Sequence, residues 1–101
     1  MIVYNISLQV NRRINDEWLL WQKMEHIPEV MASGYFIDYK FFHLLEQNED
    51  DAITYIVQYS ASSIDHYYQY MDKAAAAFRK KINEKWDDEL IAFRTIMEIV
   101  H

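Results

Sequence analysis

The sequence predicts an α+β fold in which four strands and two helices follow one another in the order βαββαβ. Three observations favour this fold. Four runs are rich in β-branched and aromatic residues, two longer segments repeat apolar residues at helical spacing, and the 101 residues include one Gly and one Pro. Sandwiches and barrels of many short strands need many tight turns, so this scarcity of turn residues argues against them. The length predicts a single domain, residues 1–101.

The spacing of apolar residues changes between the first strand and the first helix, from every second residue to the spacing of a helix. Apolar and polar side chains alternate along residues 2–10, which is typical of a strand. Asp16 and Glu17 then favour a helix N-terminus, where the helix dipole stabilises acids. At about 100° per residue, one broad arc of this helix holds Ile14, Trp18, Leu20, Trp21, Met24, Ile27 and Met31. Pro28 removes a backbone donor, so we expect a kink or a stop at Ile27 and one further turn.

A hairpin and a second helix follow. Residues 35–45 and 53–60 have the composition of strands, and the polar segment 47–51 is the turn between them. Ser62 is the predicted N-cap of the second helix, with Asp65 three residues further on as in a capping box. The apolar stripe of this helix consists of Ile64, Tyr67, Tyr68, Met71, Ala74, Ala75, Phe78, Ile82 and Trp86.

The last strand, residues 91–100, completes the ferredoxin-like or split βαβ arrangement. Both helices then cover one face of a four-stranded antiparallel sheet, and the other face stays open. We expect the more apolar rows to face the helices, namely Tyr4, Ile6, Leu8, Tyr35, Ile37, Tyr39, Tyr55, Val57, Tyr59, Phe93 and Met97. Alternation then places on the open face Val3, Asn5, Ser7, Phe36, Asp38, Lys40, Phe42, Thr54, Ile56, Gln58, Ala92, Arg94, Ile96 and Glu98.

This open face mixes aromatic and β-branched side chains with amides, hydroxyls and one Arg. Such a surface suits a second copy of the same sheet with a semi-polar cavity between the two, so we expect a homodimer of the α+β barrel type. The aromatic content of 16% exceeds what one small core needs, which favours the same interpretation. The alternative is a solvated face, with Tyr hydroxyls in water at the edge of the core.

Composition excludes several classes of partner. Ten Lys and Arg stand against 16 Asp and Glu, and a net charge of −6 lacks the positive footprint of a nucleic-acid-binding protein. No run approaches the ~20 apolar residues of a membrane span, and the N-terminus lacks signal-peptide features. The absence of Cys fits the cytoplasm. The four His lack metal-ligand spacing and there is no Gly-rich phosphate loop, so we expect no metal and no cofactor.

Glu25 and His26 are the candidate catalytic residues. On a regular helical wheel Glu25 lies between Trp18 and Trp21, on the apolar side of the first helix. Burial among indole rings disfavours a charged carboxylate and suits it to proton transfer. Histidine titrates near neutral pH, so His26 could shuttle protons. The simpler alternative is an ordinary ion pair for Glu25 and a surface position for His26.

Arg94 leads the candidate ligand-binding residues. A guanidinium on a sheet face can hold a carboxylate or a phosphate through two parallel hydrogen bonds. The amides of Asn5 and Gln58 and the indole of Trp21 would orient a small organic ligand beside it. The alternative for Arg94 is an ion pair with a protein acid.

Five segments carry a family resemblance. They are Met1–Ile6, the stretch from Trp18 to Val30 with its Trp-x-x-Trp and Glu-His-Ile-Pro elements, Gly34–Phe36, Thr54–Tyr59 and Phe93–Glu98. Together they resemble the small bacterial proteins grouped as domain of unknown function 4286. The resemblance covers nearly the whole chain and implies the dimeric α+β barrel superfamily, in which two ferredoxin-like sheets face each other. That superfamily includes small monooxygenases, isomerase-like and EthD-like proteins, and ligand-sensing domains.

Two functions are consistent with these observations. The first is a cofactor-independent enzyme, of oxygenase or isomerase type, acting on a small organic molecule in a cavity between sheet and helices. The second is a non-catalytic small-molecule-binding or regulatory dimer that uses the same cavity. A purely structural dimer is a third alternative, and occupancy of the cavity would distinguish it from the other two.

Overall fold

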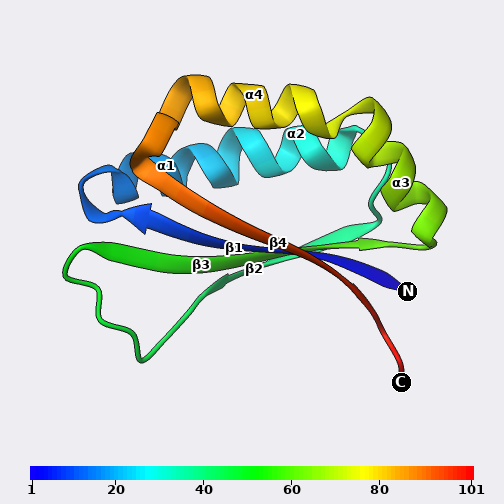
Figure 1. Ribbon diagram of the computed structural model, residues 1–101, viewed down its shortest axis with the longest axis horizontal. Coiled ribbons are helices and arrows are strands. Elements are labelled where there is room, and N and C mark those ends of the chain that lie inside the picture. Colours follow the sequence, from blue (N-terminus) through cyan, green and yellow to red (C-terminus); the bar gives the residue numbers. More distant parts are fainter.

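The computed structural model describes residues 1–101 and contains one sheet covered by two long helical segments. The strands are β1 (Ile2–Asn11), β2 (Asp38–His43), β3 (Ala52–Ala61) and β4 (Leu90–Glu98). The first helical segment comprises η1 (Arg12–Ile14), α1 (Asn15–Trp21), η2 (Gln22–His26) and α2 (Ile27–Ala32), and the second comprises α3 (Ile64–Lys73), α4 (Ala75–Trp86) and η3 (Asp87–Glu89). Both segments lie on the same side of the twisted sheet (Figure 1), so the predicted ferredoxin-like fold is confirmed.

The sheet has the strand order β2-β3-β1-β4, and every neighbouring pair is antiparallel. In the central β1–β3 ladder Tyr4 lies opposite Tyr59, and Leu8 lies opposite Tyr55. All four side chains are buried in the core beneath the helices. The rows predicted for these two strands therefore face the helices as expected.

The predicted orientation of β4 is wrong by one residue. In the β1–β4 ladder Ile6 lies opposite Arg94, and Ser7 lies opposite Phe93. Phe93 and Met97 are therefore on the open face, and the side chains that face the helices are Leu90, Ala92, Arg94, Ile96 and Glu98. Because β4 is an edge strand and largely exposed, the number of apolar residues in each row does not indicate which row is covered.

The segment before β2 also departs from the prediction, because it is not a strand. Phe36, expected on the open face, is 4% exposed and lies in the core, whereas Ile37 is 56% exposed. Strand alternation applies only from Asp38 onward. There Tyr39 lies opposite Tyr59, as expected.

The second helical segment begins one residue later than predicted and is broken in its middle. Ser63, rather than Ser62, is the N-cap of α3, and its Oγ accepts a hydrogen bond from the backbone N–H of His66 at 3.4 Å. The helix breaks at Ala74, whose φ of −128° lies outside the helical range. The break gives α3 and α4 different directions over the sheet (Figure 1).

The first helical segment continues through Pro28 instead of stopping there. The backbone N–H of Ile27 donates to the carbonyl of Gln22, five residues back, so η2 is a π-helical turn. Pro28 then stands in the first turn of α2, where a backbone donor is not required. The wide turn holds one extra residue and rotates the side chains that follow it relative to a regular helix. As a result His26 is buried and Glu25 faces solvent.

Trp18 anchors the first helical segment on the sheet. It is 1% exposed, and its ring packs on Tyr55 at 5.1 Å and against the edge of Phe41 at 6.1 Å between centroids. Such aromatic contacts add to the free energy gained by removing the indole from water. Trp18 therefore sets the distance between this helix and the central strands.

Trp18→Ala should lower the free energy of unfolding by about 3–5 kcal/mol, the usual loss on emptying a large aromatic site. Leu20, which is 63% exposed on the same helix, supplies the matched control. Leu20→Ala should change the free energy of unfolding by less than about 0.5 kcal/mol. Urea unfolding followed by circular dichroism measures both values, and equal losses would show that this helix presents another face to the sheet.

Candidate functional site

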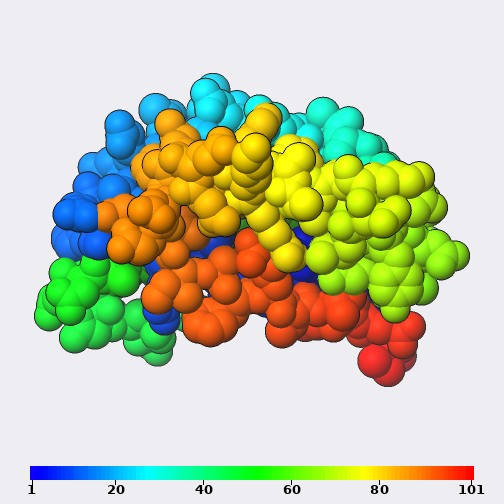
Figure 2. Space-filling view, turned by 45° about the horizontal axis from the view of Figure 1, so that its top comes forward, coloured from blue at the N-terminus to red at the C-terminus, as the bar shows by residue number.

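A cavity lies between the first helical segment, α4 and the sheet. Its volume is about 30 Å³, which is room for one or two water molecules. The lining consists of Ile6, Leu8, Trp18, Trp21, Gln22, His26, Ile82, Leu90 and Arg94. In Figure 2 dark-blue atoms of β1 are visible between α4 and β4, so the cavity lies beneath a groove between these two elements.

His26 is the buried titratable group of this cavity. It is 7% exposed, its ring stacks on Trp21 at 4.9 Å with an interplanar angle of 17°, and it meets Phe78 edge-on at 5.9 Å. Its Nδ1 is buried and has no hydrogen-bond partner. A buried polar atom without a partner is costly, so an occupant that bonds to Nδ1 would remove an existing penalty.

Burial lowers the pKa of His26 to about 4, because desolvation penalises the charged imidazolium. Among nearby charges Glu29 raises this pKa, and Arg94 and Lys81 lower it. The imidazole is therefore neutral at neutral pH. A neutral ring can accept one hydrogen bond and donate another, according to its tautomer.

Arg94 and Gln22 bring further polar groups to the cavity. Arg94 reaches it from edge strand β4 and remains exposed to solvent, whereas Gln22 is 3% exposed on η2. Gln22 was not among the predicted site residues, because a polar residue on a regular helix is expected to face water. Its position four residues after Trp18 is the one signal that could have indicated burial.

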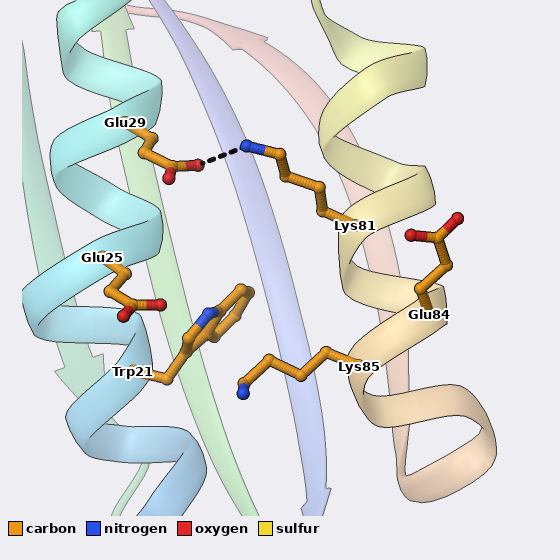
Figure 3. Close-up of a pocket in the computed structure, with 6 residues that line it drawn as sticks. All are labelled: Trp21, Glu25, Glu29, Lys81, Glu84 and Lys85. Atoms are coloured by element: carbon orange, nitrogen blue, oxygen red, sulfur yellow. Dashed lines mark hydrogen bonds and ion pairs between the residues drawn. The ribbon is translucent and has the colours of Figure 1, made fainter.

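Glu25 lies outside the cavity, and its expected burial between two Trp residues is wrong. The wheel assumed a regular helix, and the π-helical turn shifts Glu25 to the solvent side. Figure 3 shows it on the first helical segment beside Trp21, across an open groove from α4. That groove is lined by Trp21, Glu25, Glu29, Lys81, Glu84 and Lys85, and in it Lys81 pairs with Glu29 at 3.2 Å. The two candidate catalytic residues therefore point to different environments.

Asn5 and Gln58 lie on the open face of the sheet, where they were expected. They are directly opposite each other, and Nε2 of Gln58 donates to Oδ1 of Asn5 at 3.2 Å. The sheet separates this amide pair from Trp21, His26 and Arg94 on the helix side. The expected ligand-binding residues therefore form two groups that cannot touch one ligand within a single chain.

The chain matches a described protein family along nearly its whole length. Residues 1–100 match the family described as Domain of unknown function (DUF4286). The chain belongs to this family. The match confirms the resemblance seen in the sequence.

Solved structures share the fold of this DUF4286 chain at low sequence identity. A dimeric ferredoxin-like protein from an uncultured marine organism superposes with a TM-score of 0.72 at 8% identity, covering 99% of this chain and 95% of its own. An ethyl tert-butyl ether D (EthD) family protein from Bacillus halodurans C-125 gives 0.71 at 16% identity, covering 99% and 100%. A mutant of SnoaB, a cofactor-independent oxygenase from Streptomyces nogalater, gives 0.63 at 8% identity, covering 99% and 94%.

No curated protein sequence matches the chain. None of its helices combines the length and the apolar character that crossing a membrane would require. Nowhere do three or more His, Asp or Glu side chains gather in an arrangement that could hold a metal ion.

The depressed pKa of His26 predicts a specific loss of stability in mild acid. In the unfolded chain the pKa of His26 has its ordinary value of 6.5, whereas in the folded chain burial lowers this pKa to about 4. The contribution of neutral His26 to the free energy of unfolding is therefore fully present above about pH 6.5 and is lost as the pH falls toward 4. Between neutral pH and about pH 4, wild type should lose roughly 3 kcal/mol more than His26→Gln.

Urea unfolding at a series of pH values measures this difference. The comparison with His26→Gln subtracts the contributions of carboxylates and of the other His residues, which both proteins share. If the free energy of unfolding changes with pH in the same way for both proteins, His26 is not buried in its neutral form.

Proposed function

We propose that the protein is a cofactor-independent enzyme that acts on a small organic molecule at the cavity between helices and sheet, with His26 as the proton acceptor. The observation that carries this proposal is a buried, neutral imidazole whose Nδ1 has no partner, in a cavity that also contains a guanidinium. The absence of membrane-spanning helices is compatible with a cytoplasmic enzyme.

The first chemical step follows from this arrangement. With Nε2 protonated, the lone pair of His26 Nδ1 takes a proton from an acidic C–H or O–H bond, and the electron pair of that bond stays on the substrate as an enolate or a phenolate. Arg94 stabilises the negative charge at the mouth of the cavity. Return of the proton to a different carbon completes an isomerisation. In an oxygenation the carbanion instead gives its electron pair to dioxygen, a C–O bond forms, and the proton held by His26 passes to the peroxide anion, so the product is a hydroperoxide. The fold shared with SnoaB, a cofactor-independent oxygenase, supports the second class.

The alternative function is a non-catalytic small-molecule-binding or regulatory module at the same cavity. A specific observation favours it. A general base works best when its pKa lies near the operating pH, and a pKa of about 4 makes free His26 a weak base. In that case the imidazole and Arg94 would bind the ligand without moving a proton.

Proton abstraction can be tested without knowing the final product. The protein is incubated in D₂O with enolisable carbonyl compounds and phenols, and deuterium incorporation at acidic carbons is followed by NMR. We expect wild type and Glu25→Gln to accelerate exchange for at least one compound and His26→Gln to lose that acceleration. Retained exchange in His26→Gln would remove His26 from the reaction. Saturable binding with no exchange would favour the binding module.

We also propose that the chain forms a homodimer through the open face of its sheet. Large apolar side chains lie on the same face as the Asn5–Gln58 pair and remain exposed within one chain, namely Phe42 (43%), Ile91 (54%), Phe93 (58%) and Met97 (40%). Exposed apolar side chains that share one face of a protein mark an interaction surface. The structural neighbour described as a dimeric ferredoxin-like protein supports the same assembly.

Phe93→Glu should dissociate this dimer, because it places a charge among the exposed apolar side chains of the open face without touching the helix-covered core. Light scattering at micromolar concentration should give twice the 12.3 kDa mass of one chain for wild type and the single mass for the variant. Leu20→Glu, on the helical side of the molecule, should remain dimeric. A monomeric wild type, or a dimeric Phe93→Glu, would contradict the assignment of this face.

A further inference from the structure

The polar side chains that line the cavity have one property in common, namely that each can donate hydrogen bonds. They are Gln22, His26 and Arg94, and no acidic residue lines the cavity. Arg94 carries a positive charge and cannot accept a hydrogen bond. A site with donors on its walls and no carboxylate stabilises a negative charge.

Arg94 differs from the other arginines of the chain in its partners. Arg13 forms an ion pair with Glu89, Arg12 donates to the carbonyl of Glu49 at 2.8 Å, and Arg79 donates to Tyr4 Oη at 3.1 Å. Arg94 forms no such hydrogen bond or ion pair and stays at the mouth of the cavity. The predicted alternative, an ion pair with a protein acid, is therefore not formed within one chain. Its guanidinium is free to bind an external anion through two parallel hydrogen bonds.

The size of the enclosed space limits which anion can enter it. A volume of about 30 Å³ accepts a group comparable to one or two water molecules. A planar carboxylate is of this size, whereas a complete aromatic or alkyl molecule is not. The larger part of a ligand must therefore lie in the groove above, against the apolar side chains of Trp21, Ile82 and Leu90.

We infer that the ligand of this cavity is a monocarboxylate with an apolar body, whose carboxylate inserts between Gln22, His26 and Arg94. The inference rests on the second proposed use of this cavity, as a binding module, because a carboxylate bonded to Nδ1 leaves no lone pair there for proton abstraction, and it names the class of the ligand. One carboxylate oxygen accepts a hydrogen bond from Nδ1–H of His26, which gives that buried atom the partner it lacks. Arg94 donates to the carboxylate from β4, and the side-chain amide of Gln22 donates from η2.

Binding of a carboxylate is coupled to protonation of His26. The charged groups that act on this ring are Glu29 on α2, Lys81 on α4 and Arg94 on β4. A bound anion adds a negative charge beside the imidazole, so the pKa of His26 rises from its value of about 4 in the free protein. By linkage, the affinity for the carboxylate must increase as the pH falls below neutrality.

The experiment titrates the full-length protein with phenylacetate and, separately, with the uncharged phenylacetamide, and follows the ring resonances of His26 by NMR. Phenylacetate should shift these resonances saturably, and phenylacetamide should bind at least roughly tenfold more weakly. Arg94→Gln should weaken phenylacetate binding by roughly tenfold. Arg12→Gln, which removes an equal charge from a residue that does not line the cavity, should leave the affinity unchanged. The affinity of wild type should rise between neutral pH and about pH 5, and that of His26→Gln, followed through the NMR resonances of phenylacetate itself, should stay constant.

Equal binding of phenylacetate and phenylacetamide at His26 would overturn the carboxylate inference and leave the cavity as a ligand site. Carboxylate binding that Arg94→Gln does not weaken would also overturn it. No response of His26 to either compound would overturn both the inference and the proposed location of the site. Carboxylate binding without deuterium exchange would support the inference and favour a binding role over catalysis.

Discussion

One missing backbone donor determines where the buried polar groups of this protein lie. Pro28 cannot donate to the preceding turn, and the chain continues its helix by inserting a wide turn in which Ile27 bonds to Gln22. Gln22 already lies on the side that Trp18 anchors on the sheet, four residues after it, and the extra residue of the wide turn brings His26 to the same side. The polar character of the cavity thus depends on backbone hydrogen bonding more than on side-chain propensity.

Because the helices cover only one face of the sheet, the same strands present two chemically distinct surfaces. On the helix side a neutral imidazole and a guanidinium meet in a small enclosed space. On the other side the Asn5–Gln58 amide pair lies among exposed apolar side chains. Because adjacent residues of a strand point to opposite faces, one chain can support ligand binding and self-association without conflict between them.

The parts of the structure that follow simple periods could be predicted from the sequence. The βαββαβ order and the inward rows of β1 and β3 follow from alternation along strands that are buried on one face. The orientation of β4 could not be predicted, because an edge strand has no strongly buried row to reveal its phase. The position of His26 could not be predicted either, since a wheel of constant angle contains no π-helical turn. Both failures affect the cavity. It contains His26 where Glu25 was expected, and Arg94 is on the helix side of the sheet although it was predicted on the open face.

The walls of the cavity differ in how firmly they are held. Its floor is β1, which bonds to strands on both sides, whereas the wall that carries Arg94 is β4, which bonds to β1 alone. Strands at a sheet edge open locally at a much lower free energy than global unfolding requires. The residence time of an occupant should therefore follow the rate at which β4 separates from α4. Substitutions in β1 would alter the melting temperature, and substitutions in β4 would alter how long a ligand stays bound.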